Sequence, residues 1–448
     1  MKSQAWKSDT ILKKSNILTS DRHVPYYPFR IKQKENIWII RNLITQQEYE
    51  LNNSAYWLLS LCDGYRTLDE IITELSTYHN TDRYTILDLC FPLLEKLTKD
   101  GILWWRRNRM NFWKSPAPAG ILWDLTSKCN LRCKHCVVSG GEAERDGLNT
   151  HQCFELINEF AEFGITQLIL SGGEPMMRDD FFEIAEYAAK KEIFVQVATN
   201  GTLIDENASQ RFARIDACLQ VSLDSSEPSI HDQFRQSPGS WNKTIKGIKN
   251  LVQAGVPVTL AATVTTINIG NIPSLYKYAK ELGVQTFRIL PFIPFGRGIY
   301  AGELEVAPEM MRDITKLLFS KRKEAGPVIS SMEFECTFSP PLDHKTNANT
   351  RIGCDGAISY CTITSEGDVL PCNYFAGAEV ENVKDKSFRW IWDHSRFLNY
   401  FRSLKVSDIY GSCQQCDWLS TCRGSCLAAN FAHKDIFQSN CHCWLANP

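Results

Sequence analysis

Three closely spaced cysteines are the residues of this chain best suited to chemistry. The stretch "SKCNLRCKHC" at 127–136 contains Cys129, Cys133 and Cys136, with three and then two residues between them. Three thiolates can hold three irons of a 4Fe-4S cluster and leave the fourth iron for a ligand that is not part of the protein. A structural zinc site would need a fourth Cys or His, and His135 lies between two ligands of the same tight loop. The spacing therefore predicts an iron-sulfur cluster with one open position.

Length and charge limit the classes of function. The chain has 448 residues, enough for about two to four domains. Its 49 basic and 51 acidic residues give a net charge of -2, so no overall field attracts nucleic acid or an anionic membrane. The run "WWRRNRMNFWK" at 104–114 is basic and aromatic, and we interpret it as a linker rather than an RNA-binding strip. We expect neither a nucleic-acid partner nor a membrane partner.

Cysteine usage indicates the compartment. No apolar run approaches the roughly 18 residues of a membrane span, and the start "MKSQAWKSDTILKK" lacks a secretory signal, so we expect a cytoplasmic protein. Seventeen cysteines in a reducing compartment are better metal ligands than disulfide partners. Twelve of them fall in two zones, 129–136 and 354–443. Cys62, Cys90, Cys153 and Cys218 lie in regular apolar patterns and are expected to be packing residues.

The first part of the chain predicts a small winged-helix-like domain over 1–105. A hairpin is expected over 37–50, and helical periodicity follows at about 54–62, 68–78 and 83–99. A further strand then leads to a linker, 106–120, that ends in "SPAPAG".

Strands and helices alternate over 121–330 and predict an α/β fold. Helices are expected near 150–163 and 179–191, and the expected strands are 121–125, 167–170, 194–199, 218–223, 258–263 and 286–290. Six such strands suit a partial, TIM-like (β/α)6 barrel with a parallel sheet. The regular pattern fades after about 330, so 331–448 is treated as a cysteine-rich C-terminal domain.

Every distinctive loop of the barrel follows a strand. The three cysteines follow the first strand, and the next five loops carry "SGGEP", "TNGT", "SLDS", "TVTT" and "PFIPFGRG". Each loop alone is an ordinary turn. Chemistry in such barrels sits after the C-terminal ends of the strands, so their common placement predicts one shared cofactor site.

The cysteine spacing together with "GGEP" after the second strand resembles the radical S-adenosylmethionine (SAM) enzymes. In that family the open iron chelates SAM, and an electron supplied from outside, for example by flavodoxin or ferredoxin, releases a 5'-deoxyadenosyl radical that removes a hydrogen from the substrate. The resemblance implies that Gly172, Gly173 and Glu174 meet the methionyl amino group of SAM. It implies that Ser222 and Asp224 contact the ribose and that Arg235 faces the SAM carboxylate. Asn200 is a further candidate for a SAM contact. A solvated loop is the alternative for the segment "HDQFRQSPGS" that contains Arg235.

The C-terminal cysteines resemble the SPASM extension of these enzymes, which holds two auxiliary 4Fe-4S clusters and makes three clusters in all. By this resemblance Cys354, Cys372 and Cys426 serve one cluster, and Cys413, Cys416 and Cys422 serve the other, which Cys441 or Cys443 completes. The fourth ligand of the first cluster stays open between Cys361, Cys336 and a substrate thiolate. A paired zinc ribbon is the alternative. Asn373 replaces the catalytic Asp of the sulfatase-maturing branch, which argues against formylglycine formation.

The first domain resembles the peptide-recognition element of ribosomal peptide pathways, related to the small chaperone of pyrroloquinoline quinone synthesis. The stretch "LNNSAYWLLSLCDGYRTLDEIITEL" carries this likeness, which implies that a leader peptide binds as an added strand. A DNA-binding winged helix is disfavoured, because the third helix is rich in acidic residues. We therefore expect an enzyme that joins two residues of a precursor peptide through a thioether or carbon-carbon bond. The alternatives are radical oxidation of a side chain or small molecule in a cofactor pathway, and a non-catalytic, metal-stapled peptide-binding protein. The sequence does not identify catalytic side chains.

Overall fold

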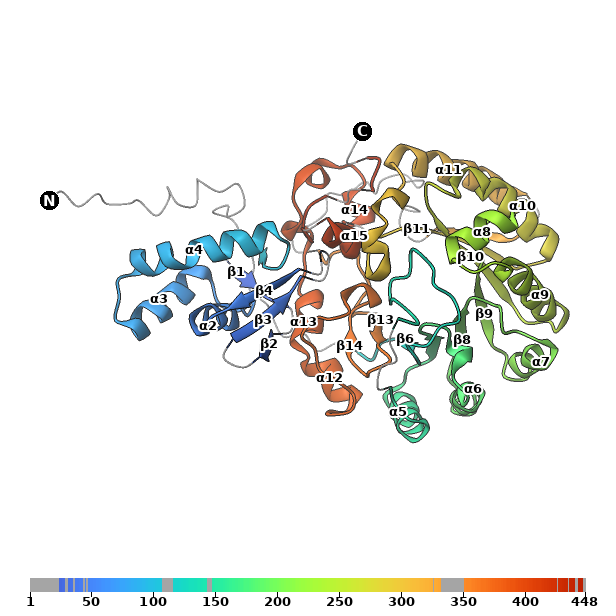
Figure 1. The fold of residues 1–448 in the computed structure, drawn as a ribbon, viewed down its shortest axis with the longest axis horizontal. Coiled ribbons are helices and arrows are strands. Elements are labelled where there is room, and N and C mark those ends of the chain that lie inside the picture. The colour runs from blue at the N-terminus through green and yellow to red at the C-terminus, as the bar shows by residue number, and fades with distance from the viewer. Residues whose placement is uncertain are drawn as a thin grey trace.

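The computed structural model describes residues 24–28, 31–34, 37–42, 45, 47–106, 116–142, 147–324, 326–331, 350–424, 426–433, 435–439 and 442–445. The first domain lies at one end of the molecule, the barrel at the other, and the C-terminal residues between them (Figure 1). Within these described ranges, no helix is both long and apolar enough to cross a membrane.

The first domain pairs a small antiparallel sheet with three helices. The expected hairpin is present, and one more strand pairs with its outer side to give the order β2-β3-β4. Helix α3 starts with a capping box, in which Thr67 accepts from the Glu70 amide and Glu70 accepts from the Thr67 amide. The elements are β1 (Val24–Tyr26), β2 (Ile31–Lys34), β3 (Ile37–Arg41), β4 (Glu48–Leu51), α2 (Asn53–Leu61), α3 (Leu68–His79), α4 (Arg83–Lys99) and β5 (Trp104–Arg106).

The barrel strands follow one another in chain order, each parallel to the last. This confirms the α/β fold and the six predicted strands. Helices cover the outside of the sheet (Figure 1). The elements are β6 (Gly120–Asp124), α5 (Thr150–Phe163), β7 (Gln167–Ser171), α6 (Phe181–Lys190), β8 (Phe194–Thr199), α7 (Glu206–Arg214), β9 (Cys218–Ser222), α8 (Pro228–Arg235), α9 (Ser240–Gln253), β10 (Val258–Val264), α10 (Ile272–Leu282), β11 (Thr286–Pro291), α11 (Pro308–Ser320) and β12 (Val328–Ser331).

The sheet continues beyond the six predicted strands at both sides. Strand β12 adds to β11, and the C-terminal strand β13 (Tyr360–Ile363) pairs in parallel with β6. Strand β14 (Val369–Leu370) then turns back antiparallel to β13. The C-terminal region is therefore built onto the first strand of the barrel. Its helices are α12 (Phe388–His394), α13 (Arg396–Arg402), α14 (Leu419–Cys422) and α15 (Leu427–Ala432).

An aromatic cluster joins the first domain to the C-terminal region. Tyr26 stacks on Tyr400 with ring centroids 4.2 Å apart, and Trp104 meets Phe431 edge-on at 5.1 Å. Trp104 and Trp105 are each only 3% exposed. The linker interpretation of 104–114 is therefore wrong for its first residues, because β5 pairs with β1 and buries both tryptophans. Residues 107–115 lie outside the described residues.

Candidate active site

The loop after β6 brings the three predicted cysteines together. Burial and the neighbouring Cys133, Glu174 and Cys136 raise the pKa of Cys129 to about 11, offset in part by the Leu131 amide. Each sulfur faces a different N–H group: Leu131 donates to Cys129 at 3.4 Å, Gly140 to Cys136 at 3.3 Å and Arg235 to Cys133 at 3.7 Å. Such donors stabilise thiolates, so these residues fit a cluster held by three sulfurs.

The glycines of "SGGEP" are required by close packing against the start of this loop. Gly172 adopts φ +134°, and a Cβ there would lie 2.4 Å from the Thr126 carbonyl oxygen. A Cβ on Gly173 would lie 2.2 Å from the Lys128 carbonyl oxygen. The Gly173 and Glu174 amides donate to these same two carbonyls, at 2.8 and 2.7 Å. The backbone of the glycine loop therefore positions the segment that carries the cysteines.

Glu174, the predicted contact of the SAM amino group, is held by the neighbouring loop of the barrel. Its side chain is fully buried, and it accepts from the Thr199 hydroxyl and the Asn200 amide, both at 2.8 Å. Burial raises the pKa of Glu174 to about 7, although these hydrogen bonds oppose the shift. This carboxylate therefore joins the loops after β7 and β8, and its predicted contact with SAM stays a prediction.

Asn200 connects the loop after β8 to the cysteine loop. Its side-chain amide donates to Asn130 Oδ1 at 2.8 Å, and Asn130 in turn donates to the Thr202 hydroxyl at 2.8 Å. Asn200 is 7% exposed. In this structure it contacts the neighbouring loop, and its predicted contact with SAM stays a prediction.

Asp224 and Arg235 form a buried ion pair behind Cys133. Arg235 Nε donates to Asp224 Oδ2 at 2.7 Å, and the Thr263 amide donates to Asp224 Oδ1 at 3.1 Å. Burial opposes ionisation of Asp224, but Arg235, His135 and His231 together lower the pKa of this carboxyl. Each oxygen of Asp224 thus has one partner within the protein, and the expected ribose contact stays a prediction. The solvated-loop alternative for Arg235 is also wrong, because Arg235 is buried in helix α8.

Ser222 is the other predicted ribose contact, and this role also stays a prediction. Ser222 ends β9, beside Ala261 of β10, and is half-buried. His135 is half-buried and stacks on Phe234 with ring centroids 4.1 Å apart, which agrees with its poor placement as a fourth ligand.

Arg297 is a site residue that the sequence analysis did not single out. Its backbone amide donates to the Cys136 carbonyl at 2.9 Å, and its Nε donates to the Cys133 carbonyl at 2.9 Å. Its Nη1 pairs with Glu142 at 2.7 Å. The "GRG" of the sixth loop was a weak signal for this role, because the partners are backbone carbonyls that no side-chain pattern reveals.

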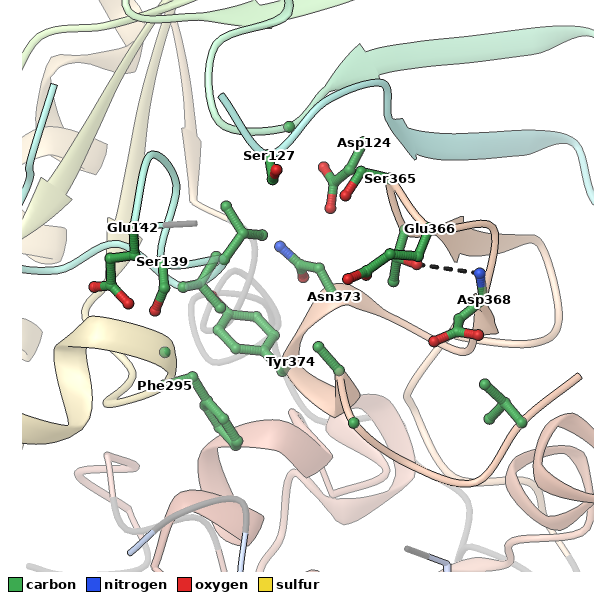
Figure 2. Close-up of a pocket in the computed structure, with 18 of the residues that line it drawn as sticks. Asp124, Ser127, Ser139, Glu142, Phe295, Ser365, Glu366, Asp368, Asn373 and Tyr374 are labelled. Carbon is green, nitrogen blue, oxygen red and sulfur yellow. Dashed lines mark hydrogen bonds between the residues drawn. The ribbon is translucent and has the colours of Figure 1, made fainter. Parts of the chain in front are cut away.

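A cavity of about 950 Å³ opens beside the cysteine loop. Figure 2 shows Asn373 in its middle, with Ser127 and Asp124 of the barrel on one side and Tyr374 and Phe295 on another. Ile39 and Glu48 of the first domain also line it. The cavity therefore has walls from all three parts of the chain.

The C-terminal cysteines gather in two groups. Burial raises the pKa of Tyr360 well above its usual range, and Cys372, Cys354 and Cys426 add to the shift, so these three lie around one phenol. Cys413 and Cys422 likewise act on Cys416. These are the two sets of three that the family resemblance implied.

Cys361 is a poor fourth ligand for the first group. It is fully buried on β13, where neighbouring side chains point to opposite faces, and the charged group that acts on it is Arg402. Tyr360, the preceding residue, faces Cys354, Cys372 and Cys426 instead. Cys443 is described and half-buried. The predictions for Cys441 and Cys336 lie outside the described residues.

Three family profiles match the chain. They are "Radical SAM superfamily" over residues 123–279, "Iron-sulfur cluster-binding domain" (SPASM) over 354–417 and "Coenzyme PQQ synthesis protein D (PqqD)" over 38–103. An AdoMet-dependent heme synthase of Oleidesulfovibrio alaskensis is 32% identical over 338 residues, covering 71% of this chain and 84% of the relative. The chain belongs to the radical SAM superfamily. It is accordingly a radical SAM enzyme whose cofactors are SAM and 4Fe-4S clusters, and the non-catalytic alternative is not retained.

Other relatives have names of two kinds, heme synthase and peptide maturase. An AdoMet-dependent heme synthase of Methanosarcina barkeri is 31% identical and covers 73% of this chain and 96% of the relative. The mycofactocin maturase MftC of Mycobacterium tuberculosis is 30% identical, covering 70% of this chain and 80% of the relative. Among solved structures, Streptococcus suis SuiB bound to SAM has a TM-score of 0.62 at 17% identity, covering 96% of this chain and 99% of SuiB. At that identity SuiB supports the three-part fold alone.

Proposed function

We propose that this radical SAM enzyme modifies a ribosomally made precursor peptide and forms a cross-link, either a thioether or a carbon-carbon bond. The observation that carries the proposal is the cavity, because its walls include Ile39 and Glu48 of the PqqD-like domain as well as the barrel rim. A peptide held by the first domain can thus continue into the space beside the cysteine loop. SuiB has been crystallised with the precursor peptide SuiA, and MftC is named a maturase, which agrees with such a substrate.

The roles of the chain's own residues follow from their positions. We propose that Cys129, Cys133 and Cys136 hold the barrel cluster, while Arg235 supports Cys133 and presents its charge toward the SAM carboxylate. The other proposed SAM contacts are Gly172, Gly173, Glu174, Asn200, Ser222 and Asp224. When bound, cluster and SAM supply a radical that removes a hydrogen atom from the substrate. The barrel sheet and the C-terminal region then position the peptide and exclude water.

The remaining assignments are proposals of the same kind. The two C-terminal groups, Cys354, Cys372 and Cys426 and then Cys413, Cys416 and Cys422, are proposed to hold auxiliary clusters, with Cys441 or Cys443 completing the second. A flavodoxin or ferredoxin is the proposed electron donor, and the cytoplasm is the proposed compartment. The proposed domains are 1–105, 121–330 and 331–448, joined by the linker 106–120.

The leader peptide is proposed to bind at β4. This strand lies at one side of the three-stranded sheet, and α4 flanks it, because Lys96 lies 5.0 Å from the Tyr49 ring and Tyr49 donates to Asp100 at 2.8 Å. Helix α4 exposes Leu89 by 71%. An edge strand beside exposed apolar side chains is a typical site for an added peptide strand.

The first experiment is a mass measurement. Reconstituted enzyme, SAM and reductant are incubated with the precursor encoded beside this gene, and the cross-linked product is expected to be about 2 Da lighter, since two hydrogens are lost. An unchanged peptide, or one altered at constant mass, contradicts cross-linking. Asn373 in the cavity accepts no proton, so no formylglycine is expected.

The second experiment tests the docking site. Leu89→Glu is expected to weaken leader binding by roughly tenfold or more, because a charge replaces an exposed apolar side chain on the helix that flanks β4. Leu317→Glu on α11, where the native side chain is 41% exposed, is the matched control and should leave affinity unchanged. Equal affinities for all three proteins would place the leader elsewhere.

Radical SAM chemistry on a small molecule is the second candidate, favoured by the identity to heme synthases. It predicts heme formation from an iron porphyrin and no requirement for a peptide. Supplying each substrate to the same enzyme separates the two candidates.

A further inference from the structure

Glu305, His433 and His442 form a cluster outside both cysteine regions. Each offers one ligand atom, and these atoms lie within 4.8 Å of one another. Glu305 lies between the short helix η4 (Gly302–Leu304) and α11, whereas His433 directly follows α15. Figure 1 shows the segment after β11 beside α15. The three residues therefore meet at the junction of the barrel and the C-terminal region.

The spacing of the three atoms suits a metal. Glu305 Oε2 lies 3.2 Å from His433 Nε2 and 3.3 Å from His442 Nε2. Bonds of about 2.0–2.1 Å at tetrahedral angles place neighbouring ligand atoms roughly 3.3 Å apart. The two rings are nearly perpendicular, at 88°, so the imidazoles approach the shared oxygen from different directions.

The ligand types select a class of ion. Two imidazole nitrogens and one carboxylate oxygen are the donors of Zn²⁺ and related divalent transition metals, whereas Ca²⁺ and Mg²⁺ prefer oxygen alone. The side chain of His442 is 8% exposed and that of Glu305 is 25% exposed, while His433 is 40% exposed. The site is thus buried on one side and open on the other, where water can be the fourth ligand.

The barrel side of the site is rigidly held. The Thr266 amide donates to the Leu304 carbonyl at 3.1 Å, and the Thr266 hydroxyl donates to the Glu303 carbonyl at 2.7 Å. These bonds fix the turn that presents Glu305. A metal bound here would tie this turn to His442, which directly precedes the predicted cluster ligand Cys443.

We infer that Glu305, His433 and His442 bind one Zn²⁺ ion that joins the barrel to the C-terminal region, separately from the iron-sulfur clusters. The alternative is a hydrogen-bonded cluster, in which two histidines donate to one carboxylate without a metal. The inference does not depend on the substrate.

The test uses the full chain with its clusters reconstituted, supplied with Zn²⁺. Zinc is expected at about one per chain, and X-ray absorption should show nitrogen and oxygen ligands at about 2.0–2.1 Å with no sulfur. His433→Gln should weaken Zn²⁺ binding by roughly a hundredfold or more, since even residues outside the ligand set are worth about 10–100-fold. The iron content of this variant should equal that of wild type. Glu305→Gln should likewise weaken Zn²⁺ binding without loss of iron.

His151→Gln is the matched control. His151 also meets a glutamate, Glu155, at 3.4 Å, but no third ligand accompanies them among the residues that the structure describes. Wild-type affinity for Zn²⁺ is expected in this variant. Chelation should lower the melting temperature of wild type and control but not of His433→Gln. Absence of zinc, zinc bound through sulfur, or wild-type affinity in both site variants would overturn the inference and leave a hydrogen-bonded cluster.

Discussion

The two cysteine regions are built in opposite ways. In the barrel, Cys129, Cys133 and Cys136 lie on one loop, and neighbouring loops hold that loop in place. In the C-terminal region, the cysteines around Tyr360 come from positions as far apart as Cys354 and Cys426. The barrel cysteines thus belong to one loop that other loops hold in place, whereas the C-terminal cysteines meet only once distant segments have packed. Loss of a cysteine should therefore affect activity and stability differently in the two regions.

Loss of a barrel cysteine is expected to have the largest effect on activity. Cys133→Ala should reduce SAM cleavage by roughly a thousandfold or more, because the cluster that supplies the electron is lost. Iron should fall by about four atoms per chain, with the C-terminal clusters retained. Iron analysis and SAM cleavage assays measure both. Cys218→Ala, at a half-buried position on β9, is the control. Loss of all iron from this variant would show that the C-terminal clusters depend on the barrel cluster.

Loss of a C-terminal cysteine should separate the two regions. Cys372→Ala is expected to keep SAM cleavage within about threefold of wild type but to lower the melting temperature, because the cysteine joins segments that are distant in sequence. Product formation should fall at least tenfold, roughly, if the auxiliary cluster accepts the substrate electron. Calorimetry and coupled product assays report these quantities. Loss of SAM cleavage would show that the barrel site depends on the C-terminal one.

Arg297→Met tests whether hydrogen bonds from the sixth barrel loop hold the cysteine loop in place. The change removes bonds to the Cys133 carbonyl and to Glu142, at a cost of about 1–3 kcal/mol. Iron should then leave the barrel site faster under a chelator, with the C-terminal iron unaffected. Arg211→Met is the control, because Arg211 pairs with Glu186 away from the site. Equal rates of iron release in the two variants would show that Arg297 does not stabilise the cysteine loop.

The smallest effect is expected for Thr199→Val. It removes the hydroxyl that donates to the buried Glu174, and the lost hydrogen bond should lower the free energy of unfolding by about 1–3 kcal/mol. Urea unfolding of the protein measures this. Thr77→Val on the exposed face of α3 should change stability by less than about 0.5 kcal/mol. Equal losses would mean that Glu174 does not depend on Thr199.

The regular parts of the barrel were predictable because periodicity reports them directly. Strand β8 was predicted over its whole length, and α5 likewise, since an Asn cap and a Gly after its end mark both boundaries. The same logic missed β13, because a short strand whose partner is more than two hundred residues earlier has no local signal.

The site shows a similar division. The cysteines and glycines were predicted because spacing and backbone demands belong to single loops. The partners of Glu174 and Asp224 within the protein were not, since these partners come from other segments of the barrel. Arg297 was missed for the same reason, because its partners are carbonyls of a distant loop.

The parallel pairing of β13 with β6 has a consequence for how this protein is made. During synthesis on the ribosome, β6 emerges long before β13, so the N–H and C=O groups on its outer side lack a strand partner while the rest of the barrel assembles. A truncated chain that stops after β12 would keep that exposed edge and would be prone to aggregate. Strand β13 thus covers an edge of the barrel sheet that stays exposed until residues 360–363 have been made.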